Sequence, residues 1–139
     1  MTKKNKKLLN ILNNKLKIGA HIFTCETRPK PYKRSKRALE QGELTGRHPT
    51  MYGYMSPDDL LIVINEQVAP SFQLETLLHE ILHALIEIDG TRESFKRGTE
   101  ERIVQALGHG LTQVLLDNKN VLDAIICVRQ SRPTPAHKK

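Results

Sequence analysis

Two histidines and a glutamate in an apolar segment have the types and spacing of a metal-dependent hydrolytic site. His79 and His83 are four residues apart, and Glu80 directly follows the first histidine. On an α-helix, positions four apart differ by about 40° around the axis and about 6 Å along it, so both imidazoles could share one metal ion. Glu80 would lie beside the metal, where it could take a proton from a water molecule. This H-E-x-x-H pattern predicts a zinc hydrolase, most often a metalloprotease.

The residues around this motif favour a largely buried helix over two exposed histidines. Leucine and isoleucine occupy most of the other positions between 74 and 88. Such a helix has little solvent-facing surface, so His79, Glu80 and His83 are expected to be partly buried and to need partners. Leu82, inside the motif, is expected to lie in the hydrophobic core.

Two histidines do not complete a catalytic zinc site, which usually has three protein ligands. The candidates further along the chain are Glu100, Glu101 and His109. Both glutamates would open a helix over 100–117, where acidic side chains also complement the helix dipole. His109 would project away from the apolar face of that helix, about 140° from Val104. The residues therefore favour a glutamate and leave Glu100 and Glu101 both open.

Composition predicts one small domain. The chain has 139 residues, no Trp and 4% aromatic residues, so we expect a modest aliphatic core. No apolar stretch reaches transmembrane length, and the basic start of the chain does not match a secretory signal. Cys25 and Cys127 are far apart, which favours free thiols in a reducing compartment. We expect a cytoplasmic protein without a membrane segment.

The net charge of +7 is concentrated in three basic clusters. The clusters are Lys3, Lys4, Lys6 and Lys7; Lys30, Lys33, Arg34, Lys36 and Arg37; and Arg129, Arg132, Lys138 and Lys139. Such clusters attract polyanions, but they are also common on solvated surfaces and in loose tails. No nucleic-acid-binding motif accompanies them. Nucleic acid therefore stays an open alternative as a partner, and the sequence does not indicate an oligomeric state.

Periodicity and turn residues predict the elements that would position the motif. A basic amphipathic helix is expected within 1–19, from 3 to 17. The other expected elements are strands over 20–24, 50–55 and 60–65, the motif helix over 70–89, a helix over 100–117 with Thr99 as its N-cap, a last helix over 120–128 with Asn120 as its N-cap, and a flexible basic tail over 129–139.

The order of strand, H-E-x-x-H helix and following glutamate resembles gluzincin-type zinc metallopeptidases. In its compactness the chain is similar to small metallopeptidase-like proteins of phages and other mobile elements. In that group the third ligand is a glutamate, followed three residues later by a small or branched residue and six later by a larger apolar one. Glu101, Val104 and Leu107 match this spacing. The resemblance covers about 52–117.

This resemblance implies a fold and a chemistry. The fold is a minimal zincin-like α+β domain, with a core over 50–117 in which a small antiparallel or mixed sheet packs on the motif helix and a following ligand-bearing helix. Zn²⁺ would be held by His79, His83 and Glu101. Glu80 would act as general base in hydrolysing a peptide bond of a protein or peptide substrate.

The resemblance also implies how a substrate is held. The strand over 60–64 would be an edge strand that pairs with an extended peptide. Tyr52, Tyr54 and His109 are candidate donors to the oxyanion that forms during hydrolysis.

Two other functions are compatible with the residues. A SprT-like protease, which acts on DNA-bound proteins, would take its third ligand from His109, which precedes Gly110, and would suit the basic charge. A non-catalytic phage-type protein would bind nucleic acid or protein and keep a structural zinc. Such a protein has no need for a base at Glu80.

Overall fold

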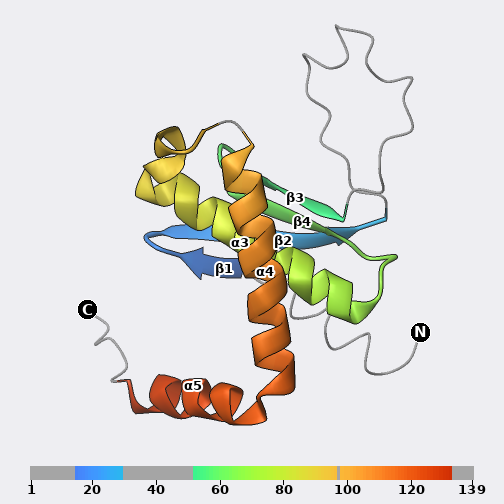
Figure 1. Cartoon of the computed structure of the whole chain (residues 1–139), viewed down its shortest axis with the longest axis vertical. Coiled ribbons are helices and arrows are strands. Elements are labelled where there is room, and N and C mark those ends of the chain that lie inside the picture. The colour runs from blue at the N-terminus through green and yellow to red at the C-terminus, as the bar shows by residue number, and fades with distance from the viewer. Residues whose placement is uncertain (1–14, 30–51, 97, 133–139) are drawn as a thin grey trace, which may run out of the picture.

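The computed structural model describes residues 15–29, 52–96 and 98–132, which form a mixed α+β fold (Figure 1). The elements in chain order are β1 (Lys15–Ile18), β2 (His21–Arg28), β3 (Gly53–Ser56), β4 (Leu61–Asn65), α3 (Pro70–Asp89), the short 3₁₀ helix η2 (Thr91–Ser94), α4 (Thr99–Asp117) and α5 (Lys119–Ser131). The α+β class expected from the sequence is confirmed.

The described strands form one mixed sheet in the order β1-β2-β4-β3. β2 and β4 are parallel, whereas β1–β2 and β3–β4 are antiparallel pairs. The expectation that residues 60–64 form an edge strand is wrong, because β4 lies between β2 and β3. A short turn joins β3 to β4, in which the Ser56 hydroxyl donates to Asp59 at 2.7 Å. This hairpin places β3 at the edge.

Lys15–Ile18 form a strand, so the amphipathic helix expected over 3–17 is wrong for its last three residues. Lysine alternates with leucine and isoleucine in this segment, a period of two that suits a strand with one buried face. Gly19, at a φ of 59°, provides the left-handed residue of the turn into β2. Residues 3–14 lie outside the described part of the chain.

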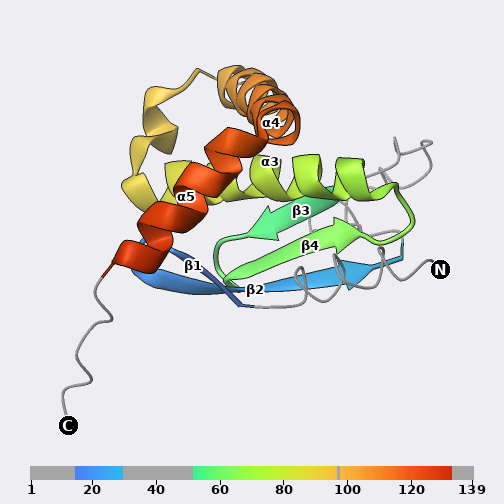
Figure 2. The ribbon, with the colours of Figure 1, turned by 90° about the horizontal axis from the view of Figure 1, so that it is seen from below.

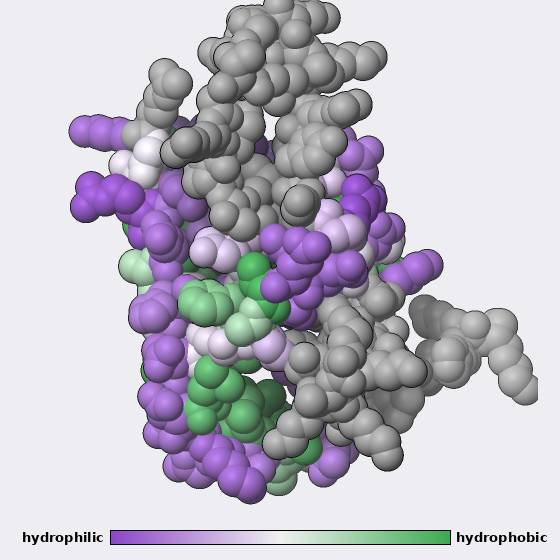
Figure 3. All heavy atoms as spheres, turned by 90° about the vertical axis from the view of Figure 1, so that its right-hand side faces the viewer, coloured by the Kyte–Doolittle hydropathy of each residue, from purple (hydrophilic) through white to green (hydrophobic). Residues whose placement is uncertain are grey.

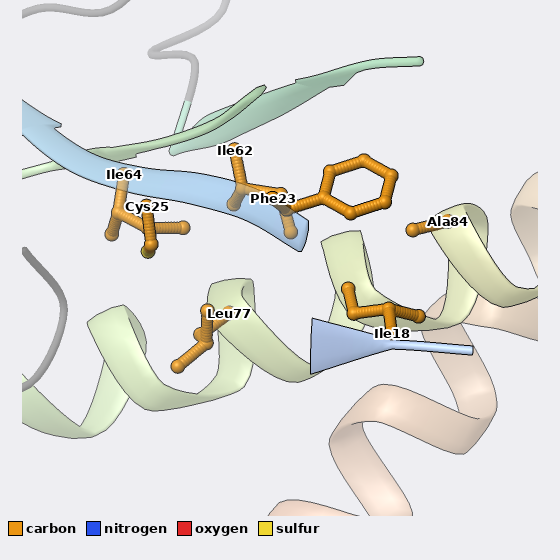
Figure 4. Packing of buried hydrophobic residues seen from close by; sticks show 7 residues of the cluster. All are labelled: Ile18, Phe23, Cys25, Ile62, Ile64, Leu77 and Ala84. Atoms are coloured by element: carbon orange, nitrogen blue, oxygen red, sulfur yellow. The ribbon is translucent and has the colours of Figure 1, made fainter. Parts of the chain in front are cut away.

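The hydrophobic core lies between one face of the sheet and α3 (Figures 2 and 4). Its cluster of buried residues consists of Ile18, Phe23, Cys25, Ile62, Ile64, Leu77 and Ala84. β2 contributes Phe23 and Cys25 to this cluster from the centre of the sheet. The unpaired Cys25 thiol is part of this cluster, and Cys127 is exposed.

Leu82 does not occupy the core position expected for it. It is half-buried, and the neighbouring Ile81 packs against the core cluster instead. Leu77, Ile81, Ala84 and Ile88 recur at helical spacing on the side of α3 that faces the sheet. Leu82 is turned away from Ile81 by about 100°.

Gly53 allows β3 to pass close to α3. A Cβ atom at this position would lie 2.6 Å from the Val63 carbonyl oxygen and 2.7 Å from Thr76 Cγ2. Neither contact is sterically acceptable, so only glycine fits. The close packing fixes the edge strand beside the helix that carries the motif.

The bounds of α3 match the expected helix. Pro70 is in its first turn, and Gly90, at a φ of 71°, ends it in the left-handed conformation. α4 begins after Gly98, so Thr99 is its first helical residue and not its N-cap. α4 crosses over α3, where Gly108 lies against His79: a Cβ on Gly108 would be 3.4 Å from His79 Cα.

α5 follows Asn118 and not Asn120, and it continues through Ser131. The flexible tail expected over 129–139 is therefore wrong for 129–131. Arg129 lies in the last turn, where a positive charge complements the helix dipole, and residues 133–139 lie outside the described chain.

α5 turns away from the end of α4 (Figure 1) and has no buried residue. Exposed aliphatic side chains of the two helices are Ile103, Leu107, Leu111, Val114, Leu116, Leu122, Ile125, Ile126 and Val128. On the face in Figure 3, hydrophobic atoms gather toward the bottom, bordered by hydrophilic ones. Among the described residues, no helix combines the length and the apolar character needed to cross a membrane.

Candidate metal centre

The side chains of His79, His83 and Glu101 converge between α3 and the start of α4. The Nε2 atom of His83 lies 3.1 Å from Nε2 of His79 and 3.0 Å from Oε2 of Glu101. The other carboxylate oxygen of Glu101 is 3.2 Å from Nε2 of His79. The structure thus brings together the three residues that the resemblance implied as ligands.

Helix geometry and one close crossing produce this arrangement. His79 and His83 are one turn apart on the side of α3 that faces α4. Glu101 is in the first turn of α4, and two turns later Gly108 packs against the His79 backbone. The absence of a side chain at Gly108 lets the two helices approach closely enough for Glu101 to reach both imidazoles.

Each of the converging atoms can donate a lone pair to a bound cation. Burial lowers the pKa of His79, an effect that the Glu101 carboxylate opposes and the nearby His83 reinforces. A neutral imidazole offers one ring nitrogen as a lone-pair donor, and an ionised carboxylate offers only lone pairs. Three such atoms at about 3 Å repel one another unless protons or a metal ion lie between them. Two nitrogens and one carboxylate are a ligand set that suits zinc.

Glu80 is buried beside this cluster. Glu80 is only 6% exposed, and it lines the same cleft as the two histidines. Burial raises the pKa of Glu80 to about 7, with His83 opposing the rise and Glu101 adding to it. A carboxyl group with a pKa near neutrality can both accept and release a proton, as a general base requires.

The cluster opens into a cleft of about 670 Å³ between β3, α3 and the start of α4. The cleft is lined by Gly53, Tyr54, Met55, Pro57, Asp58, His79, Glu80, His83, Glu87, Arg92, Gly98, Glu100 and Glu101. Five of these residues are acidic, and Arg92 is the one Lys or Arg among the described lining residues. This local excess of negative charge, on a chain of net charge +7, favours a bound cation.

The two adjacent glutamates have different positions. Glu101 faces the Nε2 atoms, whereas Glu100 Oε1 lies 2.7 Å from Nδ1, the other ring nitrogen of His83. Arg92 approaches Glu100 from η2, with Nε 3.8 Å from Oε2. From the residue types alone, either glutamate could be the third ligand, and nothing in the sequence indicates a role for Arg92. The roughly 100° between consecutive helical positions was the signal that both could not face the metal.

His109 does not join the cluster. Its Nδ1 lies 3.3 Å from Glu75 Oε1, an exposed contact between α4 and α3, and His109 does not line the cleft. This location agrees with the helical arithmetic that disfavoured it as a ligand.

The two tyrosines expected as candidate oxyanion donors lie in different places. Tyr54 lines the cleft, but its hydroxyl accepts a hydrogen bond from Arg28 Nη1 at 3.3 Å. In the sheet, Tyr54 lies directly opposite Val63, and residues placed in this way share one face of the sheet. Val63 is not part of the core cluster that faces α3. Tyr52 stacks on Phe72 with ring centroids 6.0 Å apart, and it does not line the cleft.

The basic clusters fall mostly outside the described residues. Lys3 to Lys7 and Lys30 to Arg37 are not described, and only Arg129 and Arg132 of the third cluster are, at the end of α5.

Comparisons of the chain with protein-family models, with curated proteins and with solved structures find no match. Its function must therefore be argued from the geometry of its own residues.

Proposed function

We propose that this chain is a cytoplasmic, zinc-dependent metallopeptidase of the compact gluzincin type, which hydrolyses a peptide bond in a protein or peptide substrate. The observation that carries the proposal is the convergence of two imidazoles and one carboxylate in an open cleft, beside a buried glutamate. A sheet packed on the motif helix, with the third candidate ligand on the next helix, is the arrangement expected of a minimal zincin-like domain.

The donor atoms support zinc over the alkaline-earth ions. Calcium and magnesium take oxygen ligands, whereas zinc accepts imidazole nitrogen together with carboxylate oxygen. His79, His83 and Glu101 would hold the ion at the cleft that they line. When bound, zinc would lower the pKa of a water molecule and polarise the carbonyl of the scissile bond.

Glu80 would move the protons. It follows His79 by one residue, so it lies beside the ligands and not among them. Its carboxylate would take a proton from the attacking water and deliver it to the leaving amine. Its place in the lining of the cleft puts it within reach of that water.

β3 is the strand placed to hold an extended peptide. Three of its four residues, Gly53, Tyr54 and Met55, line the cleft, and its outer edge has no partner strand among the described residues. Backbone N–H and C=O groups on such an edge can pair with a peptide. We assign to β3 the role that the resemblance implied for 60–64.

Neither alternative gains support from a specific contact. A SprT-like site would need His109 at the metal, and His109 instead contacts Glu75. A non-catalytic zinc protein would not need an acidic side chain buried beside the ligands, as Glu80 is.

The variant Glu80→Gln tests the proposal, because it removes the base and leaves the three ligands in place. Wild type, Glu80→Gln and the exposed control Glu93→Gln would be loaded with zinc and incubated with a proteome-derived peptide library, with products identified by mass spectrometry. We expect Glu80→Gln to bind zinc and to cleave at least about 10²-fold more slowly than wild type. Equal cleavage by Glu80→Gln, or zinc-loaded wild type that cuts no peptide, would contradict the proposal.

A further inference from the structure

The ring of His83 is held from both sides. Its Nε2 faces His79 and Glu101, and its Nδ1 lies 2.7 Å from Glu100 Oε1. The Glu100 side chain is 19% exposed, whereas that of Glu101, the next residue, is 60% exposed. A glutamate that only complemented a helix dipole would have no reason to be turned inward against a ring nitrogen.

The chemistry of this contact fixes a tautomer. An ionised carboxylate accepts hydrogen bonds and cannot donate one, and His83 has a carboxylate at each ring nitrogen. With a metal ion between Nε2 and Glu101, the hydrogen of the neutral ring would lie on Nδ1 and be donated to Glu100. A neutral imidazole has only one N–H, so Nε2 then keeps its lone pair, directed at the converging ligand atoms. Carboxylates that bind the second nitrogen of a ligand histidine orient the ring and raise its basicity.

Arg92 links Glu100 to the other helix. Its Nη1 lies 2.9 Å from Glu87 Oε2 on α3, and its Nε is 3.8 Å from Glu100 Oε2 on α4. The guanidinium therefore balances the charge of Glu100 on the side away from His83. It also connects η2, between the two helices, to both of them.

We propose that Glu100 is a positioning residue: it holds His83 as the Nδ1–H tautomer with Nε2 facing the metal, and Arg92 holds Glu100 in that orientation. The inference rests on the proposed function for the identity of the metal, but the tautomer does not depend on catalysis. Glu100 and Glu101 thus divide two tasks, one orienting a ligand and the other serving as a ligand.

Zinc affinity separates these two tasks. Wild type, Glu100→Ala, Glu100→Gln, Glu101→Ala and the exposed control Glu93→Ala would compete with a chromogenic chelator for zinc. We expect Glu100→Ala to bind zinc about 10–100-fold more weakly than wild type. Glu100→Gln should lose less, because its amide oxygen still accepts the hydrogen bond, and Glu93→Ala should match wild type. Affinity of Glu100→Ala within twofold of wild type, or a loss as large as that of Glu101→Ala, would overturn the assignment.

Nitrogen NMR of the histidine rings gives a readout that a merely structural role would not produce. Metal-free Glu101→Ala, which lacks the carboxylate facing Nε2, would be labelled with ¹⁵N at histidine and examined at about pH 8.5, above the ordinary histidine pKa. In this background His83 should be the Nδ1–H tautomer with Glu100 or with Glu100→Gln, and should shift toward a mixture with Glu100→Ala. An unchanged tautomer in a folded Glu100→Ala, Glu101→Ala double variant would refute the proposal. The Nδ1–H tautomer in Glu101→Ala, together with a wild type that binds no zinc, would instead contradict the proposed function alone.

Discussion

Folding and catalysis make opposite demands on Glu80. Burial disfavours the ionised carboxylate and raises its pKa to about 7, whereas a general base must be ionised when it takes the proton. A pKa near the working pH satisfies both demands, because a substantial fraction of the molecules then carries the charge. A residue with such a shift, beside a specific set of partners in a cleft, is a candidate for a functional site.

The shift at Glu80 predicts a pH dependence of stability in metal-free protein. Its folded pKa of about 7 lies above the ordinary value of 4.5, so the folded chain binds the proton more tightly than the unfolded chain does. The contribution of Glu80 is therefore fully present below about pH 4.5 and is lost as pH rises through about 7. Relative to Glu80→Gln, wild type should lose about 3 kcal/mol of unfolding free energy over this window.

Urea denaturation of both metal-free proteins at several pH values measures this difference. Subtracting the variant from the wild type removes the contributions of the neighbouring histidines to first order. A wild-type-minus-variant difference that stays constant between pH 4.5 and 7 would show that Glu80 is not buried as described.

At the residue scale, the sequence predicted the motif residues because their relation is local. His79, Glu80 and His83 are related by one helical turn, whereas Glu101 was implied by the resemblance, whose spacing of apolar residues it matches. The contacts of Glu100 and Arg92 depend on how α3 crosses α4 and on the path of η2. No pattern along the chain encodes that crossing, so their roles emerged only from the tertiary structure.

At the scale of elements, helices were predicted better than strands. Pro70 and Gly90 mark the ends of α3 directly in the sequence. The alternation of lysine and aliphatic residues at 15–18 suits a strand, but four residues are too few to decide against the helix expected over 3–17, and only pairing with β2 does so. The order of the strands could not be predicted either. β4 lies between β2 and β3, and these two neighbours are far apart from each other in the chain.

Gly53 provides a test of how the edge strand is placed. Gly53→Ala should reduce the free energy of unfolding by about 1–3 kcal/mol, because the new methyl group meets a backbone carbonyl and Thr76. The matched control is Gly110→Ala in α4, where a Cβ would meet nothing within 4 Å. That change should stabilise the protein by about 0.5–1 kcal/mol, as alanine does in a helix interior.

Chemical denaturation of both glycine variants gives the comparison directly. If Gly53→Ala were as stable as wild type, β3 would not pass against α3 as the structure describes. The wall that β3 forms along the cleft would then differ from the one described.

For the whole molecule, the candidate site depends on the sheet only indirectly. The sheet buries one side of α3, and this leaves another side of the helix to meet α4. The candidate ligand atoms then come from two helices, so a metal bound between them would stabilise the crossing as well as complete the site. The cleft is acidic although the chain as a whole is basic. The charge at the site therefore depends on which residues meet there and not on the overall composition.

The central claim is that His79, His83 and Glu101 hold one zinc ion. Elemental analysis of freshly purified protein, after zinc is offered and excess removed, tests it most directly. Wild type and His109→Ala should each contain about one zinc per chain, whereas His83→Ala and Glu101→Ala should have lost it. Wild type without zinc, or Glu101→Ala with a full complement while His109→Ala has none, would contradict the account.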